Sequence, residues 1–248
     1  MQDSITKASK KTLILIFWLL VWEIFSLFIN NQILFPSPNR VFKSLYELIL
    51  QEYFWRCIAN SIIRVILGLL ISILLGMLLG IFSGLNRSLE EVLIPIITTI
   101  KATPIMSIII IALVWFKASN VSIFTTILIC FPIIYTNIIE GIKSSDIKLI
   151  QMAKMYKVKK RYLIREFYIP SIRSYAISSI LMCLGLAWKV SVTSEVLSTP
   201  KYSIGLNLLN SKTTLETEEL FAWTIIVVML SLLFELIFRY YVNKRNKF

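Results

Sequence analysis

The stretch Ser61–Ser83, SIIRVILGLLISILLGMLLGIFS, decides the fold class. Arg64 is its only charged residue, and its apolar side chains form a continuous run that does not alternate with polar ones. A helix that crosses a bilayer needs about 20 mostly apolar residues, whereas a strand of a membrane β-barrel would alternate. The stretch therefore predicts a transmembrane α-helix.

Five further stretches meet the same requirement: Thr12–Asn30, Val92–Phe116, Val121–Glu140, Tyr175–Leu197 and Leu220–Tyr240. Only 16% of the 248 residues are charged, against about a quarter in soluble proteins. We expect an all-α polytopic membrane protein with six transmembrane helices. The first is expected to be a retained helix, because its apolar run exceeds the h-region of a signal peptide and no small-residue cleavage site follows.

The basic residues predict the orientation. If the N-terminus lies inside, the inside segments carry far more lysine and arginine than the outside segments, most densely in the loop between the fourth and fifth spans. Cytoplasmic loops carry such an excess, so both termini are expected in the cytoplasm. The formal charge of +12 is spread between spans and forms no continuous basic face. We therefore expect contacts with membrane lipid and none with nucleic acid.

This pattern divides the chain into four parts. Residues 1–31 are the cytoplasmic tail with the first span, 32–60 an outer connection, 61–240 the main transmembrane domain, and 241–248 a second cytoplasmic tail. In the outer connection Val41, Leu45 and Leu48 repeat at helical spacing against Arg40 and Lys43. That spacing predicts an amphipathic helix on the membrane surface or on the bundle.

Glycines and prolines mark positions of close packing or local breaks within the spans. The second span carries glycines mostly at four- or eight-residue spacing: Gly68, Gly76, Gly80 and Gly84. They fall near one helix face and predict close helix packing, inside the subunit or across a dimer. Pro95, Pro104 and Pro132 weaken helical hydrogen bonding locally, which is tolerated where helices pack or line a cavity.

The loop at residues 143–173 carries an informative order of residues. Gln151-Met152-Ala153 is followed by Lys157 and then by Ile169-Pro170. This order resembles the cytoplasmic "EAA" loop of ABC-importer permeases, which reads Glu-Ala-Ala, a glycine six residues after the glutamate, and Leu-Pro. Gln151, Met152 and Lys157 depart from that pattern, the last at a turn that glycine would make easily. The spacing to Pro170 is kept.

The resemblance extends over residues 34–240 and is to the nitrate/sulfonate/taurine branch of these permeases. Leu34-Phe35-Pro36-Ser37-Pro38 is similar to a Leu-Pro-Ser-Pro signature that follows the first span. Three further segments are similar to that branch: the start of the transmembrane domain, the third span, and the fifth span with its outer loop. The matching residues are, in chain order, Asn60, Ser61, Arg64, Gly68, Lys101, Pro104, Trp188, Glu195, Ile204 and Gly205. Ser203 stands where the family has a second glycine.

The resemblance implies a type I ABC-importer permease bundle in the bacterial plasma (inner) membrane. Such a subunit pairs as a homodimer or with another permease, binds two cytoplasmic ABC ATPase subunits and receives solute from an extracytoplasmic binding protein. The solute would be small, and anionic or similar to a vitamin precursor. The implied ATPase-coupling residues are Gln151, Met152, Ala153, Lys154, Tyr156, Lys157, Ile169 and Pro170.

No enzymatic site is expected in this chain. It lacks a G-x-x-x-x-G-K-[ST] run, so we expect it to bind no cofactor and ATP to bind to the partner ATPase. It has no histidine, and Cys57, Cys130 and Cys183 lie far apart in the sequence, so no metal site is expected. A membrane-embedded enzyme would need clustered nucleophiles, acids or metal ligands, and no such constellation is present.

Charges inside the spans are candidates for a transport pathway, since each costs about 2.5–3.5 kcal/mol at membrane depth unless it has a partner or water. The pathway or gating candidates are Glu195, Trp188, Lys189, Ser191, Thr193, Lys101 and Pro104. Glu195 could instead make a structural hydrogen bond near the outer rim. Lys189 lies on a different helix face from Glu195 and could meet an anionic substrate or a glutamate. An ATP-independent secondary transporter or channel is the alternative function.

Overall fold

The computed structural model describes residues 2–245, without the side chains of residues 2–11, 15, 147, 154, 160 and 245. The described chain is helical throughout, with short connections and no strand. Its helices are α1 (Gln2–Ile29), α2 (Pro38–Ile49), α3 (Glu52–Leu85), α4 (Arg87–Ala102), α5 (Ile105–Trp115), α6 (Ala118–Lys143), α7 (Ile147–Met155), α8 (Lys160–Leu163), a π-helical turn (Ile164–Tyr168), α9 (Ile169–Ser198), α10 (Ile204–Thr213) and α11 (Thr217–Arg245).

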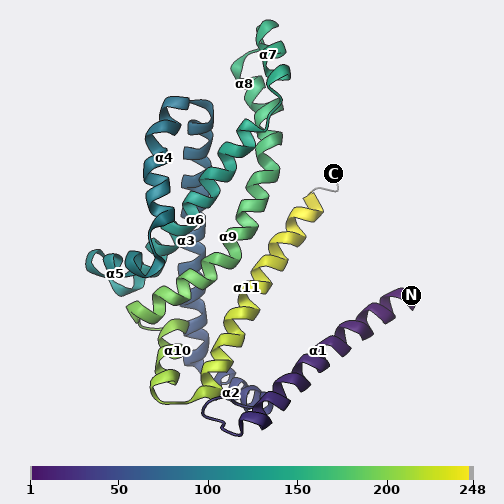
Figure 1. Ribbon diagram of the computed structural model, residues 1–248, viewed down its shortest axis with the longest axis vertical. Helices are drawn as coiled ribbons and strands as arrows, with labels where there is room; N and C mark the ends of the chain where they lie inside the picture. The colour runs from purple at the N-terminus through teal and green to yellow at the C-terminus, as the bar shows by residue number, and fades with distance from the viewer. Residues whose placement is uncertain (1, 246–248) are drawn as a thin grey trace.

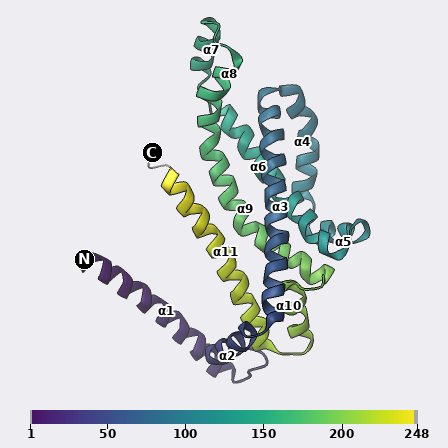
Figure 2. The same cartoon turned by 180° about the vertical axis from the view of Figure 1, so that it is seen from behind.

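Helices α3, α6 and α9 form the centre of the bundle (Figures 1 and 2). Their facing side chains belong to one buried apolar cluster, which extends to α11 through Trp223. Trp223 lies 5.0 Å, between ring centroids, from Phe54 of α3, and Trp188 of α9 packs edge-on against Phe234 of α11. These aromatic contacts join α11 to the central helices.

Five helices are long and apolar enough to cross a membrane, and the α4–α5 pair supplies a sixth crossing if it is counted as one span. The all-α polytopic fold predicted from the sequence is therefore confirmed. The third span differs from the expectation of a single helix over Val92–Phe116, because the chain bends by 102° between α4 and α5. Pro104 has no backbone N–H, and Thr103 before it is extended with ψ 129°, as steric contact with a proline ring favours.

The second span begins earlier than predicted, at Glu52 instead of Ser61. Its added turns bury Phe54, Cys57 and Ile58 in the central cluster, so packing extends the helix beyond the purely apolar stretch. Helix α2, within the predicted outer connection, buries Val41 and Leu48 and packs on α11 and α3. Helix α1 diverges from the bundle (Figure 1), and only 6% of its apolar window is buried.

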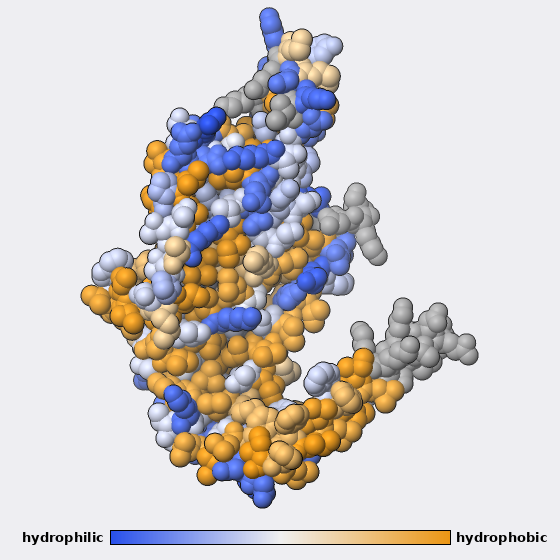
Figure 3. Space-filling view, in the orientation of Figure 1, coloured by the Kyte–Doolittle hydropathy of each residue, from blue (hydrophilic) through white to orange (hydrophobic). Residues whose placement is uncertain are grey.

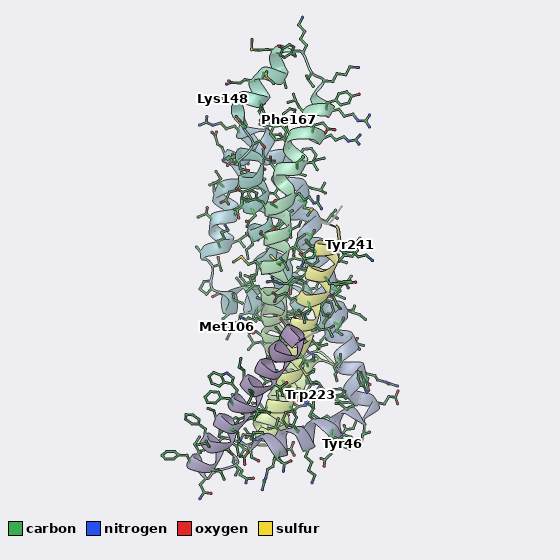
Figure 4. All side chains as sticks on the ribbon, turned by 90° about the vertical axis from the view of Figure 1, so that its right-hand side faces the viewer. Tyr46, Met106, Lys148, Phe167, Trp223 and Tyr241 are labelled. Carbon is green, nitrogen blue, oxygen red and sulfur yellow. The ribbon has the colours of Figure 1, made fainter. Side chains whose placement is uncertain are left out.

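The two ends of the bundle differ in composition. Helices α7 and α8 form one end, beyond the ends of α3 and α11, and α2 and α10 lie at the other (Figure 1). Lys148 and Phe167 mark the α7 end, and Tyr46 and Trp223 the opposite end (Figure 4). Apolar residues cover much of the bundle between them, while hydrophilic residues gather around α7 and α8 (Figure 3).

Candidate functional site

The predicted coupling loop folds into a helical hairpin. Helix α7 buries Ile150 and Ala153 against Leu163 of α8, with Phe167 and Tyr168 of the π-helical turn packed around them. The N–H of Val158 donates to the carbonyl of Ala153 at 3.0 Å, which closes the end of α7 in the manner of a helix C-cap. The hairpin is therefore a packed unit and not a loose loop.

Lys157 makes the turn between the two arms of the hairpin. Its φ is 54°, a left-handed conformation that costs a residue with a side chain about 1–2 kcal/mol. This is the position at which the EAA pattern has glycine. The chain thus keeps the backbone geometry that glycine would adopt easily, although it places a lysine there.

The outer face of the hairpin is apolar and exposed. Met155 is 83% exposed, Tyr156 79% and Met152 50%, and Gln151 lies beside them on the exposed side. Ile169 and Pro170, where α9 begins, are also exposed, and the side chain of Lys154 lies outside the described residues. Of the predicted coupling side chains that are described, only that of Ala153 faces the interior of the hairpin.

The four glycines of α3 lie against α6 within the chain. Gly68 faces Thr126, and Gly76, Gly80 and Gly84 face Ile134, Ile138 and Ile142. The constant offset shows that the two helices run parallel in register. A Cβ on Gly80 would lie 2.8 Å from the Cβ of Ile138, and Gly68 and Gly76 are equally close to α6, so these three positions accept no larger side chain without displacing α6.

Helices α6 and α9 are joined by buried hydroxyl pairs. The hydroxyl oxygens of Ser122 and Ser191 lie 2.6 Å apart, as do those of Thr125 and Ser194. All four side chains are fully buried. Each pair satisfies two polar groups that would otherwise be costly inside an apolar bundle. Ser191, a pathway candidate, thus lies in a helix–helix contact.

Glu195 lies at the centre of a buried polar network. Its carboxylate accepts hydrogen bonds from Arg64 at 2.9 Å, from the Ser61 hydroxyl at 2.8 and 2.9 Å, and from the backbone N–H of Gly205 at 3.2 Å. Ser61 also accepts from the N–H of Ile204 at 3.0 Å. A Cβ on Gly205 would be 2.5 Å from the backbone nitrogen of Val196. The network therefore joins α3, α9 and the start of α10.

One face of α9 is exposed and is not uniformly apolar. It carries, at helical spacing, the exposed Ser178, Met182, Lys189 and Thr193 and the half-buried Gly185. A Cβ built on Gly185 would meet nothing within 4 Å. The exposed faces of α3 and α11 differ, since they carry large apolar side chains such as Leu70, Leu74, Met229, Leu232 and Leu236.

The other pathway candidates differ in how far their side chains are exposed. Lys101 and Pro104 are exposed near the α4–α5 break, and the ammonium group of Lys101 donates to the Thr136 hydroxyl at 3.3 Å. A cavity of about 230 Å³ between α4 and α6 is lined by Lys101, Thr136, Glu140 and further residues. Trp188 and Glu195 are buried, so they lie away from the exposed face of α9.

Sequence reasoning missed the pairing of Arg64 with Glu195 and the part that Ser61 takes in it. The available signal was that both charges lie in apolar spans, where an unpaired charge is costly. Their separation in sequence gave no indication that the two would meet. Among the described residues, no group of histidine, cysteine, aspartate or glutamate side chains could hold a metal ion.

Comparisons with known proteins agree with this geometry. Residues 72–247 match the family model described as binding-protein-dependent transport system inner membrane component. The chain is 31% identical over 202 residues to a putative aliphatic sulfonates transport permease protein of Escherichia coli K12, covering 80% of this chain and 76% of that protein. Its counterpart in Bacillus subtilis is 25% identical over 208 residues, covering 83% and 75%. A formylaminopyrimidine transport permease protein of Halalkalibacterium halodurans is 25% identical over 166 residues, covering 66% of each chain.

Proposed function

We propose a mode of action for this chain, which belongs to the family of binding-protein-dependent transport system inner membrane components and is an ABC-importer permease, a multi-pass protein of the plasma membrane. In this proposal the chain couples to its ATPase through the α7–α8 hairpin. It conducts a small solute along the exposed face of α9. Membership in this family implies association with an ABC ATPase and a substrate-binding protein. In our proposal ATP binds only to the ATPase subunits.

The exposed apolar surface of the hairpin carries the coupling proposal. Met152, Met155 and Tyr156 project from a helix whose opposite face is already packed against Leu163. A short amphipathic helix of this kind can place its apolar face in a groove of a partner. We assign that groove to the cytoplasmic ATPase, because the hairpin lies in the most basic loop of the chain, which the positive-inside rule assigns to the cytoplasm.

The continuity of the chain from the hairpin into α9 supports a route for the coupling. The π-helical turn Ile164–Tyr168 leads directly into α9, which begins at Ile169. A movement of the hairpin would therefore tilt α9 relative to α6. The hydroxyl pairs between these two helices provide a defined contact about which α9 would move. Nucleotide-driven closure of two ATPase subunits would in this way favour one orientation of the α9 face over the other.

The polar character of one exposed α9 face supports the pathway proposal. Ser178, Lys189 and Thr193 are exposed within an otherwise apolar span, and a lysine in contact with lipid at this depth would cost about 2.5–3.5 kcal/mol. Water between two permease subunits would avoid that cost. We propose that a second copy of this chain, or a paired permease, covers this face, and that the solute arrives from an extracytoplasmic binding protein.

The coupling proposal is tested by Met155→Asp in the complete transporter. Among the apolar side chains of α7 that the structure describes, Met155 is the most exposed, so an aspartate there leaves the packed side of the hairpin intact but introduces a charge into the proposed contact. We expect normal membrane insertion, loss of co-purification with the ATPase subunits and loss of ATP-dependent uptake. Ala153→Pro, which removes a helical N–H inside α7, should also uncouple ATP hydrolysis from uptake.

The matched control is Ser88→Asp, at an exposed position in the first turn of α4. An acidic residue is favourable at a helix N-terminus, so this variant should retain both the ATPase and uptake. Unchanged co-purification and uptake in both Met155→Asp and Ala153→Pro would contradict the assignment of the hairpin as the ATPase contact.

A further inference from the structure

A groove lies between α9 and α11, which run side by side (Figures 1 and 2). The two helices touch where Trp188 packs edge-on against Phe234, with 5.6 Å between the ring centroids. One turn farther along α11, toward its C-terminal end, a cavity of about 540 Å³ lies between them. Its lining is apolar except for Arg173 and Tyr241, and the other lining residues are Met77, Ala176, Ile177, Ile180, Phe238 and Val242.

This groove lies on the side of α9 opposite to the proposed pathway. At 3.6 residues per turn, Arg173, Ile177 and Ile180 fall on one side of the helix. The exposed Ser178 and Met182, which belong to the pathway face, fall on the other side. An occupant of the groove is therefore distinct from a solute in the pathway.

Positive charge gathers at the inner end of the groove. Arg173 is exposed at the start of α9, and the last turns of α11 carry the exposed Arg239 and Lys244. The acidic residue of these turns, Glu235, pairs with Arg239 at 2.7 Å. Tyr241 marks the same end of α11 (Figure 4). Because the positive-inside rule assigns this end to the cytoplasm, the charges lie at the level of the inner-leaflet headgroups.

An apolar groove with an arginine at its cytoplasmic end fits a phospholipid. Apolar walls offer water no hydrogen-bond partners, whereas an acyl chain fills such a groove without losing any. Arginine binds phosphate through two parallel N–H donors, and tyrosine rings are enriched at the headgroup level. No acidic side chain is among the described residues that line the groove. A headgroup with a net negative charge is therefore favoured over a zwitterionic one, whose ammonium group would find no partner.

We propose that one anionic phospholipid of the inner leaflet binds in this groove, with its phosphate on Arg173 and an acyl chain along Ile177 and Ile180. Basic pockets between transmembrane helices on the cytoplasmic side are suited to such headgroups. The lipid would sit between α9 and α11 at the end of α9 that continues from the coupling hairpin. This site goes beyond the proposed function and does not depend on which solute is carried.

The test counts the lipids that stay bound to the assembled transporter, purified in a mild detergent, by native mass spectrometry. The probes are phosphatidylglycerol and phosphatidylcholine of equal chain length, added in equal amounts. We expect the wild-type protein to retain phosphatidylglycerol in preference. Arg173→Gln should lower its occupancy about fivefold, the effect of one basic residue on an anionic lipid. Ile177→Trp, which keeps the charge but fills the groove, should lower it as well.

The matched control is Arg87→Gln, which removes an exposed arginine at the start of α4, also at the inner end, and should leave the occupancy unchanged. Equal losses in Arg173→Gln and Arg87→Gln would overturn the proposal, as would unchanged occupancy in Ile177→Trp or equal retention of both lipids by the wild type. A wild-type dimer that retains no lipid, and that Ile177→Trp dissociates, would place a helix of the second copy in the groove instead. Met155→Asp should leave lipid occupancy unchanged, so the site and the coupling function can fail separately.

Discussion

Lys157 shows at the scale of one residue why a sequence pattern can be broken while its geometry is kept. The lysine was a departure from the glycine of the EAA pattern, yet its φ of 54° provides the turn that glycine would make. The strain of about 1–2 kcal/mol is offset by contacts across the hairpin, where Ile150 and Ala153 pack on Leu163. Those contacts join residues from two helices, so the sequence around Lys157 does not reveal them.

Arg64 and Glu195 give the prediction that belongs to single side chains. Removing one partner of a buried ion pair leaves an uncompensated charge and costs about 3–5 kcal/mol. We therefore expect Arg64→Met and Glu195→Gln each to lower the thermal stability of the detergent-purified protein strongly, measured by the fraction that remains monodisperse after heating. The double variant Arg64→Met/Glu195→Met should lose much less than the sum of Arg64→Met and Glu195→Met. Additive losses would show that the two residues act independently.

The pairing of α3 with α6 gives a prediction at the scale of elements. A Cβ on Gly80 would lie within 2.9 Å of two Ile138 atoms, whereas a Cβ on Gly185 would meet nothing within 4 Å. Gly80→Ala should therefore destabilise the bundle by about 1–3 kcal/mol through overpacking. Gly185→Ala should be neutral or stabilising by up to about 1 kcal/mol, because alanine favours helix. Denaturant titration of the two variants compares them, and equal stabilities would contradict the assigned packing.

The α4–α5 break marks the limit of sequence prediction for elements. Pro95 and Pro132 lie inside helices α4 and α6, whereas Pro104 separates two helices at 102°. All three prolines remove a backbone donor in the same way, so their local chemistry does not tell them apart. Pro104 differs from the other two prolines in the packing of the helix that follows it, because Ile109 and Ala112 of α5 are buried against Val121 at the start of α6. That contact fixes the direction of α5 after the break.

For the whole molecule, the length of the apolar runs predicted the membrane-spanning class and most of the spans. What the sequence left open was which faces meet. The glycines of α3 face α6, the hydroxyls of α6 face α9, and Glu195 faces Arg64. These contacts leave one face of α9 exposed along the span. The periodicity of the sequence predicts which side chains share one face of a helix. Assigning each face to a neighbouring helix requires the three-dimensional arrangement of all the helices.

The arrangement of two subunits gives the prediction that belongs to the whole molecule. If a second copy covers the α9 face, the two copies of Gly185 face each other across the pathway, and Gly185→Cys should be joined by bifunctional maleimides into a covalent dimer on a denaturing gel. Leu74→Cys, on the apolar exposed face of α3, should give little dimer because that face is expected to contact lipid. A cross-linked product of another mass would identify a different permease as the partner. A Gly185→Cys protein that transports but remains monomeric with reagents of every length would contradict the proposed placement of the pathway between subunits.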